Sequence, residues 1–202
     1  MARPRAQVRG GRVVLVESAV QNFTELGYHG TSMRDLARTA GVTVASIYHH
    51  FSSKQEILQQ IMVGTMTDVL ALTGAALDEA GPTPTERLGA LVEAWVLFHT
   101  GRQAEALIGA SELRSLDEGG RAAVVALRDE QEAVFRAVVE AGVADGEFAT
   151  THPLEAARAI INMGYSIATW YRAGGPVTPE EMAGRYRDLA LATVLARSVT
   201  GA

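Results

Sequence analysis

The residues of this sequence whose types and spacing suit chemistry gather between positions 31 and 54, where hydroxyl, imidazole and basic side chains recur over short helical segments. Short polar groups, a methyl surface and aromatic donors on one exposed helix suit base edges and thymine methyls in the major groove of DNA. A helix N-terminus beside a lysine can hold a phosphate. The predicted DNA contacts are Thr31, Ser32, Arg34, Thr43, Val44, Ser46, Tyr48, His49, His50 and Lys54.

Two short helices, near 32–40 and 43–50, must position these side chains. Ala37 supplies a small contact residue, and Gly41, four positions later, allows a turn with positive φ. Thr43 can cap the second helix. Any tight corner between two helices needs a small residue and a glycine, but here the apolar positions agree as well. The pair is predicted to close on a helix near 6–26 through Leu36, Ala40, Val42 and Ile47 on one side and Val13, Val16, Val20 and Phe23 on the other.

Charge is distributed unevenly along the chain. The formal net charge is −5, which by itself argues against a nucleic-acid partner. Residues 1–60, however, hold seven basic and four acidic side chains, whereas residues 61–202 hold eleven and nineteen. A basic N-terminal segment on an otherwise acidic chain indicates that this basic head binds a polyanion. The alternative is a solvated tail without a partner. The first twelve residues contribute Arg3, Arg5, Arg9 and Arg12.

Several function classes lack their sequence signals. Cysteine is absent, which excludes disulfides and thiolate chemistry and fits a reducing compartment. The sequence has no glycine-rich nucleotide loop, zinc-protease motif or serine-nucleophile motif, and its five histidines are not at metal-ligand spacing. No uninterrupted apolar run approaches the ~20 residues of a membrane span, and no signal peptide is recognisable. We expect a cytoplasmic protein without catalytic residues, metal or cofactor; an enzyme or an architectural DNA binder are the alternatives.

Helix signals dominate the chain and strand signals are nearly absent. Two segments, Thr83-Pro84-Thr85-Glu86 and Thr178-Pro179-Glu180-Glu181, combine an N-cap threonine, a first-turn proline and a glutamate at the third position. The prediction is an all-α fold with a helix-turn-helix DNA-binding domain at 1–55 and a helical ligand-binding and dimerisation domain at 56–202. About nine helices are expected, near 6–26, 32–40, 43–50, 53–79, 84–100, 103–117, 120–143, 153–173 and 179–199.

The last two of these helices carry more apolar residues than one core requires. The helix at 153–173 shows two apolar stripes, and the helix at 179–199 shows a stripe with further apolar residues beside it. A dimeric four-helix bundle would cover the second face, whereas burial within one large monomeric core is the alternative. The stripes are Leu154, Ala157, Ile161, Gly164, Ala168 and Tyr171; Ala156, Ile160, Met163, Ile167 and Trp170; and Met182, Tyr186, Leu189, Thr193 and Ala196.

An apolar chamber between the helices at 84–100, 120–143 and 153–173 is the predicted ligand site, although a core role is the alternative for each aromatic. Because residues 61–202 are acidic, an anionic ligand requires a local basic group, for which Arg172 is the candidate. Arg172 could equally cap the preceding helix. The candidate ligand-binding residues are Trp95, Phe98, His99, Gln131, Phe135, Met163, Ser166, Trp170 and Arg172.

Residues ~10–60 resemble the DNA-binding domain of the TetR family of one-component regulators. The resemblance implies an all-α homodimer, two domains per chain and a C-terminal pocket whose occupancy usually releases DNA. It also implies that Tyr48 and Lys54 contact phosphates and that Thr43, Val44, Ser46 and His49 face the groove. Val44 stands where many members have a polar or basic residue. The matching positions are Phe23, Gly27, Tyr28, Thr31, Ser32, Met33, Leu36, Ala37, Ala40, Gly41, Val42, Ile47, Tyr48, His50, Phe51, Ser53, Lys54, Ile57 and Leu58.

The segment from Trp170 to Glu181 is similar to the corner between the last two helices in the acyl-CoA-responsive branch of TetR regulators. Segments 127–132 and 142–148 also look like that branch, whereas Ala173 replaces a typical proline. This resemblance implies a repressor that binds palindromic operator DNA as a homodimer and is released by an acyl-CoA thioester. A TetR-type regulator that senses an uncharged hydrophobic drug or metabolite is the alternative.

Overall fold

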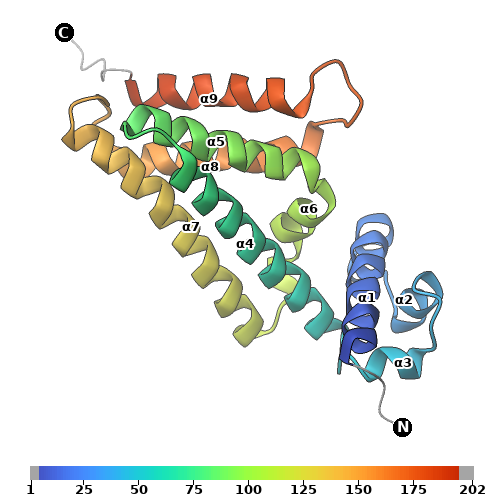
Figure 1. Ribbon diagram of the computed structural model, residues 1–202. Coiled ribbons are helices and arrows are strands. Elements are labelled where there is room, and N and C mark those ends of the chain that lie inside the picture. The colour runs from blue at the N-terminus through green and yellow to red at the C-terminus, as the bar shows by residue number, and fades with distance from the viewer. Residues whose placement is uncertain (1–4, 196–202) are drawn as a thin grey trace. The chain divides into compact units, whose positions relative to one another are not determined.

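Every regular element of the chain is a helix over the residues that the computed structural model describes, 5–195, with side chains described from residue 11 onward (Figure 1). This confirms the predicted all-α class. Arg3, Ala196 and the predicted helical residues 196–199 lie outside the described range, as do the side chains of Arg5 and Arg9. The helices are α1 (Arg5–Leu26), α2 (Met33–Thr39), α3 (Val44–Tyr48), α4 (Lys54–Glu79), α5 (Pro84–Gly101), α6 (Gln103–Ser111), the 3-10 helix η1 (Glu112–Ser115), α7 (Glu118–Ala144), α8 (Pro153–Trp170) and α9 (Pro179–Leu195).

Local capping explains where several helices begin. Thr83 forms a capping box with Glu86 at the start of α5, and Thr178 exchanges the corresponding bonds with Glu181 at the start of α9. Both predicted caps are confirmed. The glycines at 119–120, expected as a break, lie inside the first turn of α7, where Asp117 Oδ1 accepts from the Gly120 N–H at 2.7 Å.

Two helices end earlier than their sequence patterns indicate. The segment predicted as a helix at 103–117 leaves the α conformation after Ser111 and continues as η1. The helix predicted at 153–173 ends at Trp170, because Tyr171 has an extended backbone and its N–H closes the last turn on the Ile167 carbonyl. Apolar periodicity continues past both ends, so it could not locate them.

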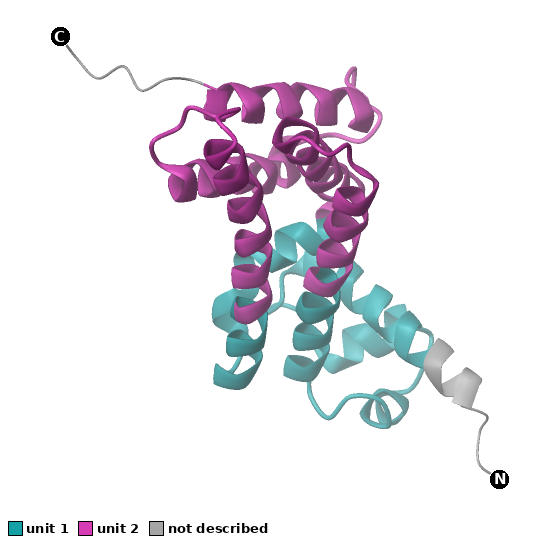
Figure 2. Ribbon diagram, turned by 60° about the vertical axis from the view of Figure 1, so that its left-hand side comes forward, with its two compact units in different colours: residues 1–65, 104–125 teal, residues 66–103, 126–202 magenta. Residues whose placement is uncertain are grey.

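The chain divides into two compact units (Figure 2). Unit 1 joins residues up to Thr65 with Ala104–Val125, and unit 2 joins Met66–Gln103 with the residues from Ala126 onward. The divisions fall inside α4 and α7, so each of these helices contributes to both units. α4 is also long and apolar enough to cross a membrane by length and composition alone, a property shared by core helices of water-soluble proteins.

The core of unit 1 forms where α1 packs against α2 and α2 packs against α3. The inward face of α1 carries Leu15, Ala19 and Phe23, which are buried. Val13, predicted to face inward, is instead 56% exposed. A stripe shifted by a few positions fits the helical period nearly as well in so valine-rich a helix, and packing decides between the two.

The core of unit 2 forms around α5, which packs against α8 and α9. Both apolar stripes of α8 are largely buried in this single chain, including Ile160 and Ile167 from one and Ala157 and Ile161 from the other. Packing within one chain therefore buries most of both stripes, as the monomeric-core alternative predicts. Gly164, which the dimer interpretation placed between subunits, lies against the Trp95 indole.

We predict that Gly164→Ala destabilises the protein by about 1–3 kcal/mol, because overpacking a tight core forces side chains to shift. A Cβ at this position would overlap Trp95 Cδ1 and Nε1. Gly74→Ala in α4 is the matched control, since its Cβ would meet nothing within 4 Å and should stabilise the helix by about 0.5–1 kcal/mol. Urea unfolding of both variants measures the two changes. Equal effects would show that Trp95 is not tightly packed on Gly164.

Candidate functional site

The helix-turn-helix in unit 1 has the local geometry that its sequence predicts. Ser32 caps α2 in a capping box with Asp35. Gly41 adopts φ +65°, a left-handed conformation that favours glycine. The Thr43 hydroxyl accepts from the Ser46 N–H at 3.1 Å and so caps α3. These short-range bonds set the angle at which α3 leaves α2.

α3 buries one side chain and turns most of the others outward. Ile47 is fully buried, whereas Thr43, Tyr48 and His49 are exposed. Val44, Ser46 and His50 are half-buried, and Ser32 and Arg34 are exposed at the start of α2. The structure thus brings most of the predicted contacts to one exposed helix and the neighbouring start of α2, and their roles toward DNA stay predictions.

Thr31 does not belong to this exposed set. Its side chain is only 2% exposed, and its hydroxyl lies within hydrogen-bond distance of the Asn22 and Gly27 carbonyls, to which it donates. Its backbone N–H is also used, by the Tyr28 carbonyl at 3.3 Å. The prediction that Thr31 contacts DNA is therefore corrected: Thr31 holds the turn between α1 and α2.

Lys54 stands at the start of α4 and points back into unit 1. Its Nζ donates to the Tyr28 and Thr31 carbonyls, each at 2.6 Å, and lies 4.3 Å from the centre of the Tyr28 ring. Burial lowers the pKa of Lys54. An ammonium has three protons, so at most one remains for a phosphate. Lys54 positions the turn before α2, a role that its sequence pattern did not indicate.

Arg12, one of the arginines of the basic N-terminal segment, also makes contacts inside unit 1. Its guanidinium donates to the His50 carbonyl at 2.6 Å, lies 3.5 Å from a Glu56 oxygen and stacks 4.0 Å over the Phe51 ring. These contacts tie α1 to the segment between α3 and α4. The N-terminal segment therefore offers less positive charge to DNA than its number of arginines suggests.

The end of η1 and the residues after it contact the start of α4 and the turn between α1 and α2 inside unit 1. The Gln55 side chain donates to the Ser115 carbonyl at 2.6 Å and accepts from the Asp117 N–H at 3.3 Å. The Ser115 hydroxyl and His29 Nε2 are 3.1 Å apart. Sequence analysis missed these residues because no local pattern joins positions about 60 or more apart.

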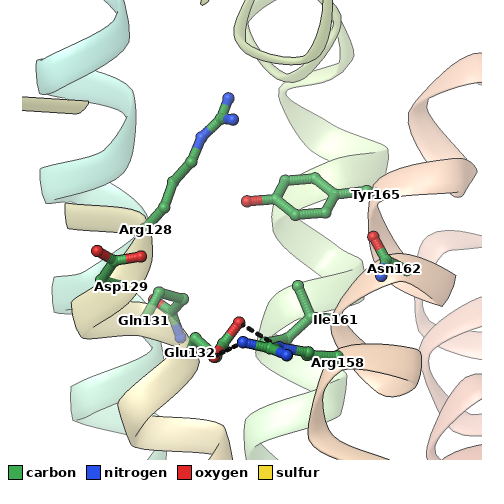
Figure 3. Close-up of a pocket in the computed structure, with 8 residues that line it drawn as sticks. All are labelled: Arg128, Asp129, Gln131, Glu132, Arg158, Ile161, Asn162 and Tyr165. Carbon is green, nitrogen blue, oxygen red and sulfur yellow. Dashed lines mark hydrogen bonds and ion pairs between the residues drawn. The ribbon is translucent and has the colours of Figure 1, made fainter. Parts of the chain in front are cut away.

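A cavity of about 240 Å³ opens between α7 and α8 in unit 2 (Figure 3). Arg158 closes one end with a paired contact to Glu132, at 3.0 and 3.1 Å, while Arg128 and Tyr165 lie toward the other end. Burial raises the pKa of Tyr165, so its hydroxyl stays protonated at neutral pH. The lining is Arg128, Asp129, Gln131, Glu132, Arg158, Ile161, Asn162 and Tyr165.

The aromatic residues predicted to line an apolar chamber instead pack against one another. The Trp95 ring centre lies 4.4 Å from that of His99 and 5.6 Å from that of Phe135, and Phe98 is buried beside His99. His99 Nδ1 lies 2.7 Å from the Trp95 carbonyl, and burial lowers the His99 pKa to about 4. His99 is therefore a neutral core histidine.

Only Gln131 among the predicted ligand residues lines the cavity between α7 and α8. Met163 is half-buried, and Ser166, Trp170 and Arg172 are exposed. The basic groups at the cavity are Arg128 and Arg158 rather than the expected Arg172. A signal was present, since positions 158, 162 and 165 recur at helical spacing on α8, but the apolar stripes beside them were stronger.

Comparisons with known proteins agree with this architecture. A model of the bacterial regulatory proteins of the tetR family matches residues 15–61, and a model of the tetracyclin repressor-like C-terminal domain matches residues 81–194. The HTH-type transcriptional repressor KstR2 of Rhodococcus jostii is 30% identical over 188 residues, which cover 90% of each chain.

Solved structures give the same result. The TetR family transcriptional regulator PfmR of Thermus thermophilus is 34% identical, with a TM-score of 0.83 over 91% of this chain and 99% of that one. KstR2 of Mycobacterium tuberculosis, described as a ketosteroid transcriptional regulator, is 25% identical, with a TM-score of 0.82 over 98% of both chains. With a helix-turn-helix of matching geometry and both family domains in order, this chain belongs to the TetR family of transcriptional regulators.

Proposed function

We propose that this protein is a cytoplasmic repressor that binds palindromic operator DNA as a homodimer and is released by an acyl-CoA thioester. The observation that carries the proposal is the outward face of α3, which presents Thr43, Ser46 and His49 beside the exposed Tyr48. Such a face matches the recognition helix of a helix-turn-helix protein. The relative from Rhodococcus jostii is itself named a transcriptional repressor.

The dimer is supported by apolar side chains that the single chain leaves uncovered. Leu189 and Leu195 on α9 and Trp170 at the end of α8 are each about half exposed. Exposed large apolar side chains on the last two helices are the kind of groups that a partner subunit would cover. A symmetric pair of these helices would cover it and would set two copies of α3 against two half-sites.

The effector class is supported by the chemistry of the cavity between α7 and α8. Every lining residue except Ile161 carries a polar or charged group. The buried Gln131 Nε2, which has no hydrogen-bond partner among the described residues, would stay unsatisfied beside an uncharged hydrophobic drug, whereas a thioester offers oxygen acceptors. The relative described as a ketosteroid regulator is named for another class of carbonyl compound.

Two segments are suited to carry a signal toward α3. α4 runs without a break from Lys54, which holds the turn before α2, to Glu79 in unit 2. Near its end, the segment 103–117 accepts a hydrogen bond at the Ser115 carbonyl from Gln55, the residue after Lys54. A ligand that displaces either segment changes the position of the helix-turn-helix, so it favours a state with lower DNA affinity.

DNA binding tests the proposal. Fluorescence anisotropy with genomic fragments should give nanomolar-range affinity that falls steeply with salt. His49→Ala should change which sequence is preferred, whereas Lys54→Ala should weaken all sequences alike. If Lys54 acts only by positioning, the slope of log K against log salt stays unchanged; loss of one phosphate contact would reduce it by about 0.9.

Arg136→Ala is the matched charge control, because Arg136 is an exposed cation on α7 in unit 2 that pairs with Glu140. It should leave both affinity and salt slope close to those of the wild type. The proposed function would be overturned if no genomic fragment showed salt-dependent binding.

A further inference from the structure

Gln131 is the one predicted ligand residue at the cavity, and its amide is incompletely satisfied. The side chain is 1% exposed, and its Oε1 accepts from the Thr73 hydroxyl at 3.2 Å. Its Nε2 has no hydrogen-bond partner among the residues that the structure describes. Buried amide donors in native proteins are nearly always paired, so a group that enters the cavity is expected to supply the acceptor.

The surroundings of Gln131 determine what kind of acceptor fits. The carboxylate of Glu132, which also lines the cavity, is already occupied by Arg158. Tyr165, across the cavity on α8, adds a protonated hydroxyl. The charged lining residues comprise two arginines and two carboxylates, so the cavity itself carries no excess charge. A neutral oxygen, such as a carbonyl, suits this donor better than a second anion beside Glu132.

The volume of the cavity limits the size of its occupant. At ~30 Å³ per water-sized group, 240 Å³ holds about eight non-hydrogen atoms. This space admits a short or cyclic acyl group and excludes a whole coenzyme A. The nucleotide of a thioester must then lie outside the cavity.

We propose that the cavity between α7 and α8 binds a small acyl group of about eight non-hydrogen atoms, with Gln131 Nε2 donating a hydrogen bond to its carbonyl oxygen. This assignment rests on the proposed effector class and makes it specific. It gives Gln131 the role of distinguishing acyl from alkyl ligands. Trp95 and His99 pack edge-on against the ring of Tyr165, one of the lining residues, and so support that side of the cavity.

A pair of ligands that differ only in the carbonyl tests the assignment. Hexanoyl-CoA and its thioether analogue S-hexyl-CoA are titrated by calorimetry into the wild type, Gln131→Leu and Gln21→Leu. Gln21→Leu is the matched control, because it also replaces a glutamine by leucine but at an exposed position on α1, outside the cavity. Palmitoyl-CoA tests the size limit.

The wild type and Gln21→Leu should bind hexanoyl-CoA at least about tenfold more tightly than S-hexyl-CoA, and palmitoyl-CoA more weakly than hexanoyl-CoA. In Gln131→Leu the ratio should fall to about one. Equal binding of acyl and alkyl ligands by the wild type overturns the inference, even if Gln131→Leu does not fold. A ratio that survives in Gln131→Leu also overturns it. Both results leave the acyl-CoA effector standing.

If no thioester binds while operator binding is intact, the proposal of an acyl-CoA effector is refuted. The role of Gln131 is then tested with a ligand that has no nucleotide. Heptan-2-one carries a carbonyl and about eight non-hydrogen atoms without a nucleotide. Its binding to the wild type and Gln21→Leu, but not to Gln131→Leu, would support the role of Gln131. Equal binding to all three proteins, or binding to none, would overturn it.

Discussion

Replacing Leu189 by glutamate is expected to convert the protein to a monomer and to lower its affinity for operator DNA at least about a hundredfold. Leu189 is 53% exposed on α9, in the proposed dimer surface with Trp170 and Leu195. In the dimer this side chain would be covered, so a carboxylate there becomes a buried unpaired charge, which costs about 3–5 kcal/mol. A separated subunit reaches one half-site only, and operator affinity falls toward that of non-specific binding.

Sedimentation velocity at micromolar concentration and anisotropy with operator DNA measure the two effects together. Leu72→Glu is the matched control, because Leu72 on α4 is similarly exposed and lies outside α8 and α9. It should leave the dimer intact. A wild type that sediments as a monomer would refute the dimer, and a dimeric Leu189→Glu variant would place the interface elsewhere. A charge at Gly164 would not serve this test, because its side chain would overlap Trp95 in the same chain.

Saturating acyl-CoA is expected to weaken operator binding about a hundredfold, which corresponds to ~2.7 kcal/mol of coupling. The physical requirement is that the thioester binds one conformation of the chain better than the other. Linkage demands that operator DNA weakens acyl-CoA binding by the same factor. Anisotropy gives the first factor, and calorimetry on the free protein and on the DNA complex gives the second.

Free coenzyme A is the matched control for this experiment, because it carries the nucleotide without the acyl group. It should bind weakly and leave the operator complex intact. An operator affinity that stays unchanged at saturating acyl-CoA would refute the coupling between the two ligands. Release by an uncharged hydrophobe, with no release by any thioester, would assign the protein to the drug-sensing type of TetR regulator.

Short-range patterns were enough to predict the helix-turn-helix. Gly41, the Thr43 cap and the buried Ile47 act within about ten residues of one another, so backbone preference and side-chain bonding settle their geometry before distant segments meet. The same reason explains the caps at Thr83 and Thr178. The DNA-binding unit and the class of protein were therefore readable from the sequence alone.

Tertiary structure decided what each side chain faces. Lys54 and Arg12 read as surface cations, yet backbone carbonyls from segments 23 to 38 residues away turn both inward. Thr31 is buried for the same reason. A basic or hydroxyl side chain has the same sequence signal whether it bonds a phosphate or a carbonyl, and only the fold brings one of these partners near.

The ligand region shows the division most clearly. The sequence placed a site among apolar residues of three helices, but Trp95, His99 and Phe135 fill that space themselves, and of the predicted ligand residues only Gln131 lines the cavity. The cavity lies instead between α7 and α8. Periodicity determines that a helix has an apolar side, whereas the volumes of side chains from segments about 30 or more residues apart determine where packing is complete and where a hollow remains.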